Sequence, residues 1–132
     1  MESVVDKLGS PDLRIVVMHH PLSYLHDWNE GDIRNILKKK CDIVLHGHLH
    51  VSEFDKIIGM RNETVVIPSG SLYQGRSLVN SYNLATVDLE HRNLTIRYRR
   101  YSDMQQAFVK DIDTTGEELD GVLQRRLENA RG

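Results

Sequence analysis

Two short stretches, LRIVVMHHP at residues 13–21 and DIVLHGHLH at residues 42–50, decide the fold that we expect for this chain. Each begins with a run of apolar, mostly β-branched residues, which predicts a buried strand. Between them, residues 32–40 carry apolar side chains at helical spacing, with Ile33 and Leu37 on one face. A strand, a helix and a second strand in this order predict a βαβ unit whose strands are parallel neighbours.

Histidines follow both predicted strands directly. His19 and His20 come after the first strand, and His46, His48 and His50 come at the end of the second. Because parallel strands end at one edge of a sheet, where ligands bind, we expect the two groups to lie close together. Imidazole is the commonest metal ligand among side chains. The spacing therefore predicts a metal site, and the alternative is a set of surface-loop histidines without a role.

The same stretches resemble a known family. Residues 19–21, HHP, resemble the H-x-P element of the calcineurin-like metallophosphoesterase superfamily, and residues 47–50, GHLH, resemble its G-H-x-H element. Residues 68–71, PSGS, and a closing β-hairpin are similar to its C-terminal half, so the resemblance covers roughly residues 10–101. It implies an α/β fold, namely the C-terminal half of a two-sheet sandwich flanked by helices. Such a half has a βαβ unit, mainly antiparallel strands after it and a C-terminal helix.

The resemblance also implies a reaction and its metal ligands. His19 and His48 would bind the second metal of a dinuclear site, and His50 would bind the first. The ions would be Mn²⁺, Fe²⁺/Fe³⁺ or Zn²⁺. The reaction would be hydrolysis of a phosphate monoester or diester by a metal-activated hydroxide, with the phosphate ester as substrate.

Three further residues receive weaker assignments from the same resemblance. His20 would contact the substrate or a metal ligand as a catalytic residue, although a structural role is the stronger alternative. Ser69 and Ser71 would lie near the substrate, and the alternative is that they belong to a plain connection.

Two N-terminal motifs of the family, D-x-H and G-N-H-[DE], do not occur in the 132 residues. The third, G-D-x-x-[DN], is matched only by GDIRN at residues 31–35, which overlaps the helix expected over residues 32–40. We therefore expect a C-terminal fragment that is inactive alone and binds at most one metal ion weakly. It would pack against the missing N-terminal half, another chain or a second copy of itself. The alternatives are a non-catalytic remnant or binding module, and a structural zinc domain held by His19, His48 and His50.

The composition argues against proteins that bind nucleic acids or membranes by charge, and against membrane-spanning proteins. The chain has 17 Lys+Arg and 19 Asp+Glu residues, a net charge of −2, which gives no footprint for nucleic acids or anionic membranes. No apolar run approaches the about 20 residues that span a bilayer. The start of the chain does not resemble a signal peptide, and the single cysteine fits a reducing compartment. We expect a cytoplasmic protein without a membrane partner.

The rest of the chain predicts strands separated by turns, at residues 54–59, 64–67, 82–89 and 93–101. In the last of them, Leu94, Ile96 and Tyr98 share one face, because strand side chains alternate.

We place a partial catalytic domain at residues 1–101, and a linker followed by a helix at residues 102–132. The helix itself is predicted over residues 117–130. Residues 70–77, GSLYQGRS, resemble a phosphate-binding loop, but Arg76 replaces its lysine and a strand-like run follows, so we favour a connection.

Overall fold

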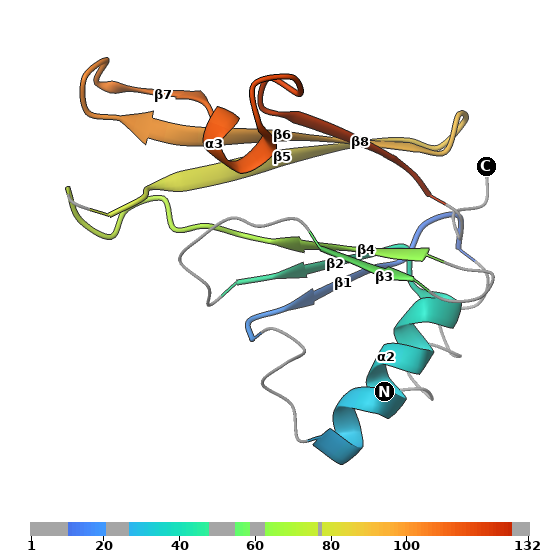
Figure 1. The fold of residues 1–132 in the computed structure, drawn as a ribbon. Helices are drawn as coiled ribbons and strands as arrows, with labels where there is room; N and C mark the ends of the chain where they lie inside the picture. Colours follow the sequence, from blue (N-terminus) through green and yellow to red (C-terminus); the bar gives the residue numbers. More distant parts are fainter. Residues whose placement is uncertain (1–10, 21–26, 48–54, 59–62, 77, 128–132) are drawn as a thin grey trace.

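The chain folds into two stacked sheets with a helix on the outer side of the first (Figure 1). The structure is a computed structural model that describes residues 11–20, 27–47, 55–58, 63–76 and 78–127. Its elements are, in chain order, β1 (Ile15–Met18), α2 (Asp27–Lys40), β2 (Ile43–His46), β3 (Asp55–Ile58), β4 (Glu63–Pro68), β5 (Ser81–Asp88), β6 (Asn93–Ser102), β7 (Ala107–Lys110), α3 (Ile112–Thr115) and β8 (Val122–Arg126).

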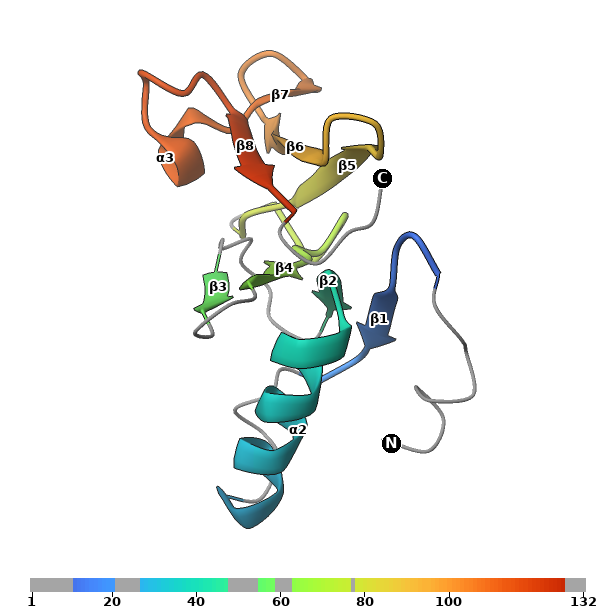
Figure 2. The ribbon, with the colours of Figure 1, turned by 90° about the vertical axis from the view of Figure 1, so that its right-hand side faces the viewer.

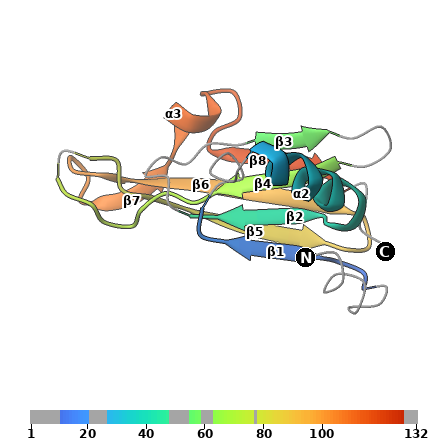
Figure 3. The same cartoon turned by 90° about the horizontal axis from the view of Figure 1, so that it is seen from below.

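The first sheet has the strand order β1-β2-β4-β3 (Figure 3). Strands β1, β2 and β4 are parallel, and β3 runs antiparallel to β4. Ile15 lies opposite Ile43, and Met18 lies opposite His46. The predicted βαβ unit is therefore confirmed, with α2 as its crossover helix.

Helix α2 packs its apolar face on this sheet. Leu37 and Cys41 are buried against Val44 of β2 and Val66 of β4. The helix begins at Asp27, earlier than the predicted start at residue 32. A glycine at position 31 weakens a helix by about 1 kcal/mol, but packing of one apolar face on a sheet outweighs such local preferences.

The end of α2 is tied to both neighbouring strands, which fixes the crossover. The Thr64 hydroxyl lies 2.9 Å from the carbonyl oxygens of both Leu37 and Cys41. The Arg14 guanidinium donates to the Lys40 carbonyl at 3.2 Å. The last carbonyls of a helix lack partners within it, so these contacts satisfy groups that burial would otherwise penalise.

The second sheet is antiparallel and packs on the first through a shared core (Figure 2). Strand β6 pairs with β5 along one edge, and with β7 and β8 along the other. Leu94, Ile96 and Tyr98 are each at most 1% exposed, which confirms the predicted alternation. They pack with Ile43 and other residues of the first sheet. Burial raises the pKa of the Tyr98 phenol to about 12.

The helix predicted over residues 117–130 is wrong for the described part of that segment. Residues 122–126 form β8, and the segment expected as a linker contains β7 and α3. Strands β7 and β8 both pair with β6, so the chain after residue 101 contributes two strands to the second sheet. The physical reason is that the second edge of β6 offers backbone partners, and Gly121 at φ +78° turns the chain onto that edge. Within the described part, no helix is long and apolar enough to cross a membrane.

Candidate functional site

The carboxyl ends of three parallel strands meet at one edge of the first sheet. Met18 of β1 lies opposite His46 of β2, which lies opposite Pro68 of β4. The pairing continues one residue further, because the Gly47 amide donates to the Met18 carbonyl at 3.2 Å and the Ser69 amide donates to the His46 carbonyl at 2.8 Å. The residues after each strand are thus brought side by side.

His19 lies next to Gly47 at this edge. A Cβ atom built on Gly47 would lie 3.6 Å from the carbonyl oxygen of His19 and 3.7 Å from its Nδ1 atom. The rings of His19 and His20 meet edge to face, with centroids 4.6 Å apart, and both residues are exposed. The first residue of the H-x-P element therefore lies next to the first residue of the G-H-x-H element, at the common edge that the βαβ unit predicts.

The other two predicted metal ligands, His48 and His50, lie outside the described residues, so all three ligand assignments stay predictions. Among the residues that the structure does describe, no group of three or more His, Cys, Asp and Glu side chains forms a metal site. The predicted ligand that the structure does describe at the edge is His19, and its imidazole suits Zn²⁺ and the neighbouring transition metals.

His46 has a different position from His19. It is buried, and its alternation with Val44 places it on the face that α2 covers. Its Nδ1 atom lies 3.1 Å from the Gly47 carbonyl oxygen. Because a carbonyl only accepts, this nitrogen carries the proton and holds the start of the G-H-x-H element. Its burial and this hydrogen bond favour a structural role for His46.

The two predicted substrate serines are separated by the fold. Ser69 lies at the edge, paired through its amide with His46, and its hydroxyl is 3.1 Å from the Gly70 carbonyl oxygen. Ser71 belongs to the approach to β5, because its carbonyl accepts from the Ser81 amide at 2.8 Å. The position of Ser69 suits a contact with substrate better than that of Ser71, and both roles stay predictions.

Asp42 is a buried carboxyl that belongs to none of the motifs described above. A charged residue directly before a buried strand is a sequence signal that could have identified it. Its Oδ2 atom accepts from the Arg14 amide at 2.7 Å and so joins β1 to β2 at their amino ends. Burial raises the pKa of this carboxyl, opposed by the Arg14 amide and the Arg14 charge.

The raised pKa of Asp42 predicts a pH-dependent stability. The folded chain holds the proton more tightly, so the free energy of unfolding should fall as the pH rises from the ordinary Asp pKa of 3.8 through the raised value. Urea unfolding between about pH 4 and 7 should show this decline, and Asp42→Asn should remove it.

Asp88→Asn is the matched control. Hydrogen bonds from His91 lower the pKa of Asp88, so its contribution is present above pH 3.8 and is lost only at lower pH. The control should leave the decline above about pH 4 unchanged. An equal decline in the Asp42→Asn protein would contradict the assignment.

Comparison with known proteins shows the fold alone. No family model matches the sequence, and no curated protein matches it. A single mutant of Vps29 from Entamoeba histolytica has 20% identity and a TM-score of 0.51, with 89% of this chain and 56% of that chain covered. Vps29 from Chaetomium thermophilum has 14% identity and a TM-score of 0.52, with 89% and 58% covered.

The chain thus spans just over half the length of the Vps29 structures that it matches. Over that length its fold is similar to that of Vps29, with a parallel three-strand arrangement and an antiparallel sheet.

Proposed function

We propose that this chain supplies the C-terminal half of a metal-dependent phosphoesterase site. His19 and His48 would bind one divalent ion and His50 a second. The observation that carries the proposal is the proximity of His19 and Gly47, the first residues of the H-x-P and G-H-x-H elements, at one sheet edge. The metallophosphoesterase fold of the chain supports it.

In this proposal, bound metal ions polarise the phosphoryl oxygens and lower the pKa of an attacking water. The residues of the chain bind and orient. The hydrogen bond between His46 and the Gly47 carbonyl fixes the backbone that leads to His48. Ser69, whose amide pairs with the His46 carbonyl at the same edge, would contact the phosphate ester.

The chain alone lacks the negative charge that a dinuclear site needs. Two divalent ions about 3.5–4 Å apart repel by roughly 18 kcal/mol at an effective dielectric of about 20. Three neutral imidazoles do not offset this repulsion. The carboxylates would come from the D-x-H motif, which the 132 residues do not contain, and from G-D-x-x-[DN]; the one match to the latter, GDIRN at residues 31–35, lies within the crossover helix α2. The proposal therefore requires a second polypeptide segment.

An apolar surface beside β1 fits such a segment. Ile15 and Val17 lie opposite Ile43 and Leu45, on the side of the first sheet that faces the second, yet they are 47% and 75% exposed. In the described part of the chain, β1 ends the strand order and pairs only with β2. An exposed strand edge next to apolar side chains is suited to pairing with another strand.

Calorimetric titration with Zn²⁺ and Mn²⁺ tests the metal part. The isolated chain is expected to bind one ion weakly, and His19→Ala and His48→Ala should each abolish that binding. His91→Ala is the control, because the β5–β6 turn lies at the opposite end of the molecule from the carboxyl ends of β1 and β2 (Figure 1). Two tight sites in the isolated chain would contradict the proposal.

Hydrolysis of bis(p-nitrophenyl) phosphate with Mn²⁺ tests the enzymatic part. The chain alone should be inactive. A polypeptide with the missing motifs, encoded in frame by the preceding DNA, should bind the chain and restore hydrolysis. If that DNA encodes no such motifs, the non-catalytic binding module replaces this proposal. If His50→Ala unfolds the chain, the structural zinc domain replaces it.

A further inference from the structure

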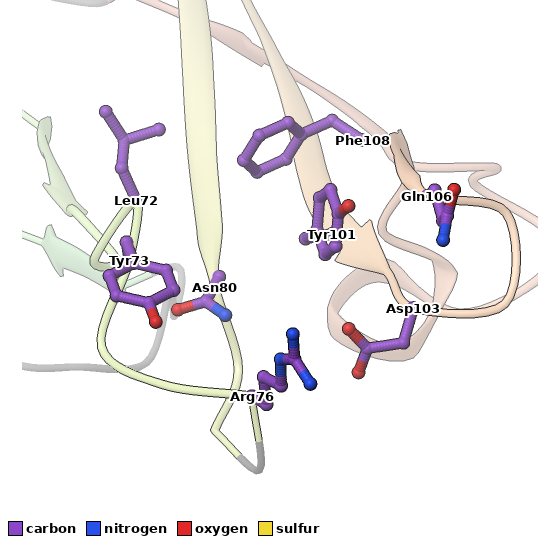
Figure 4. Close-up of a pocket in the computed structure, with 8 residues that line it drawn as sticks. All are labelled: Leu72, Tyr73, Arg76, Asn80, Tyr101, Asp103, Gln106 and Phe108. Carbon is purple, nitrogen blue, oxygen red and sulfur yellow. The ribbon is translucent and has the colours of Figure 1, made fainter.

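A concave site, away from the proposed metal site, lies where the β4–β5 connection approaches the ends of β6 and β7 (Figure 4). Its volume is about 670 Å³, which falls within the about 300–1,000 Å³ typical of small-molecule sites. The residues that matter are Tyr73, Arg76, Asn80, Tyr101, Asp103 and Phe108.

The floor of this pocket is aromatic and faces away from the core. Tyr98 is buried between the sheets, so alternation along β6 places Tyr101 on the outer face together with Arg99. Phe108 of β7 lies opposite Tyr101, and their rings meet edge to face at 5.3 Å. Tyr82 contacts Phe108 in the same way at 5.0 Å. These contacts hold the rings in place and leave a stable aromatic surface.

The wall of the pocket is formed by a loop that is tied down before any ligand arrives. The Asn80 side chain, 8% exposed, accepts from the Gln74 amide at 2.7 Å and donates to the Gly75 carbonyl at 3.0 Å. Gly75 has a φ of +132°, which favours glycine. A pre-ordered wall lowers the entropy that a ligand loses on binding.

Two opposite charges lie at the rim. Arg76 and Asp103 point toward each other from the two sides in Figure 4. Within the described residues, neither side chain forms a salt bridge or a hydrogen bond. The guanidinium is suited to a phosphate, and the carboxylate accepts from an amine.

We propose that this pocket binds a nucleotide with an amino-bearing base, such as adenine or cytosine. The base would stack on one of the two rings, Tyr101 or Phe108, and meet the edge of the other. Its exocyclic amine would donate to Asp103, and its phosphate would bind Arg76. Arg99 extends the positive charge along the same outer face. A peptide with an aromatic anchor would use the floor, but a nucleotide combines a planar ring, a donor and an anion in one molecule.

Titration of the chain with AMP, UMP and hexa-adenylate in EDTA tests this proposal, and EDTA removes any contribution from the metal site. AMP should bind saturably and more tightly than UMP. Arg76→Ala should weaken AMP binding about tenfold, because a hydrogen bond to a charged group is lost. Asp103→Asn should reduce the preference for AMP over UMP. Lys39→Ala, on the exposed side of α2, removes the same charge and should change nothing.

Comparison of hexa-adenylate with AMP distinguishes a single-stranded nucleic acid from a free nucleotide as the natural ligand. Tighter binding of hexa-adenylate than of AMP, lost in Arg76→Ala, identifies a single strand as the ligand. Equal binding identifies the free nucleotide. The proposal would be overturned if neither AMP nor hexa-adenylate bound the chain, or if Arg76→Ala left their binding unchanged. It would also be overturned if only an aromatic peptide bound. None of these outcomes bears on the metal site, which uses His19 at the edge of the other sheet.

Discussion

Replacement of Ile96 by alanine should lower the free energy of unfolding by about 2–5 kcal/mol, the range for deleting a large aliphatic side chain from a packed core. Ile96 is fully buried, at 0% exposed, in the cluster that joins the two sheets. Ala85 and Leu123 lie opposite it on the neighbouring strands. The cavity would open between the sheets, where backbone pairing on both sides of β6 limits collapse. Urea unfolding followed by circular dichroism measures the change.

Leu84→Ala provides the comparison for this variant. Leu84 is an aliphatic residue on the adjacent strand β5, but it is 55% exposed and lies on the outer face, opposite Arg97. Its truncation should change stability by less than about 1 kcal/mol, because little apolar surface is returned to water. Equal losses in the two variants would show that the two sheets do not share the core seen in the structure.

Gly121→Ala should also destabilise the chain strongly, by about 2–4 kcal/mol, through backbone strain combined with overpacking. Gly121 has a φ of +78°, which an alanine rarely adopts. An added Cβ would lie 3.1 Å from the Lys110 Cβ, 3.3 Å from the Asp111 amide nitrogen and 3.4 Å from the Tyr98 carbonyl oxygen. Since the Gly121 carbonyl accepts from the Tyr98 amide, a shift of the backbone would disturb the start of β8.

The same substitution at Gly31 should have the opposite sign. Gly31 lies within α2, and an added Cβ would meet nothing within 4 Å. Alanine there should raise the free energy of unfolding by about 0.5–1 kcal/mol, because it reduces the conformational entropy of the unfolded chain and causes no strain in the helix. Thermal unfolding of both variants measures these changes. A Gly121→Ala protein as stable as the parent would contradict the turn described at Gly121.

The sequence was sufficient to predict those features that follow from local patterns. The apolar runs before His19 and at residues 43–45 predict strands, and the helical spacing between them favours a parallel arrangement. The predicted burial holds for β2 but is wrong for β1, because β1 lies at the end of the strand order and Ile15 and Val17 are exposed. The alternation in β6 identifies Leu94, Ile96 and Tyr98 as core residues in the same way. Because the ends of parallel strands share one edge, the meeting of His19 with Gly47 was also predictable.

The C-terminal segment and the aromatic pocket were decided only by tertiary structure. Leu119, Val122, Leu123 and Leu127 can be placed on one side of a helix, yet residues 122–126 form a strand. Their backbone groups form hydrogen bonds with β6, which is distant in sequence. No local sequence pattern predicts whether this edge of β6 is available for pairing. Tyr101 and Phe108 form a common floor for the same reason, because the pairing of β6 with β7 sets their register. Local preferences differ by about 1 kcal/mol per residue or less, so a row of non-local hydrogen bonds with a buried face determines the outcome.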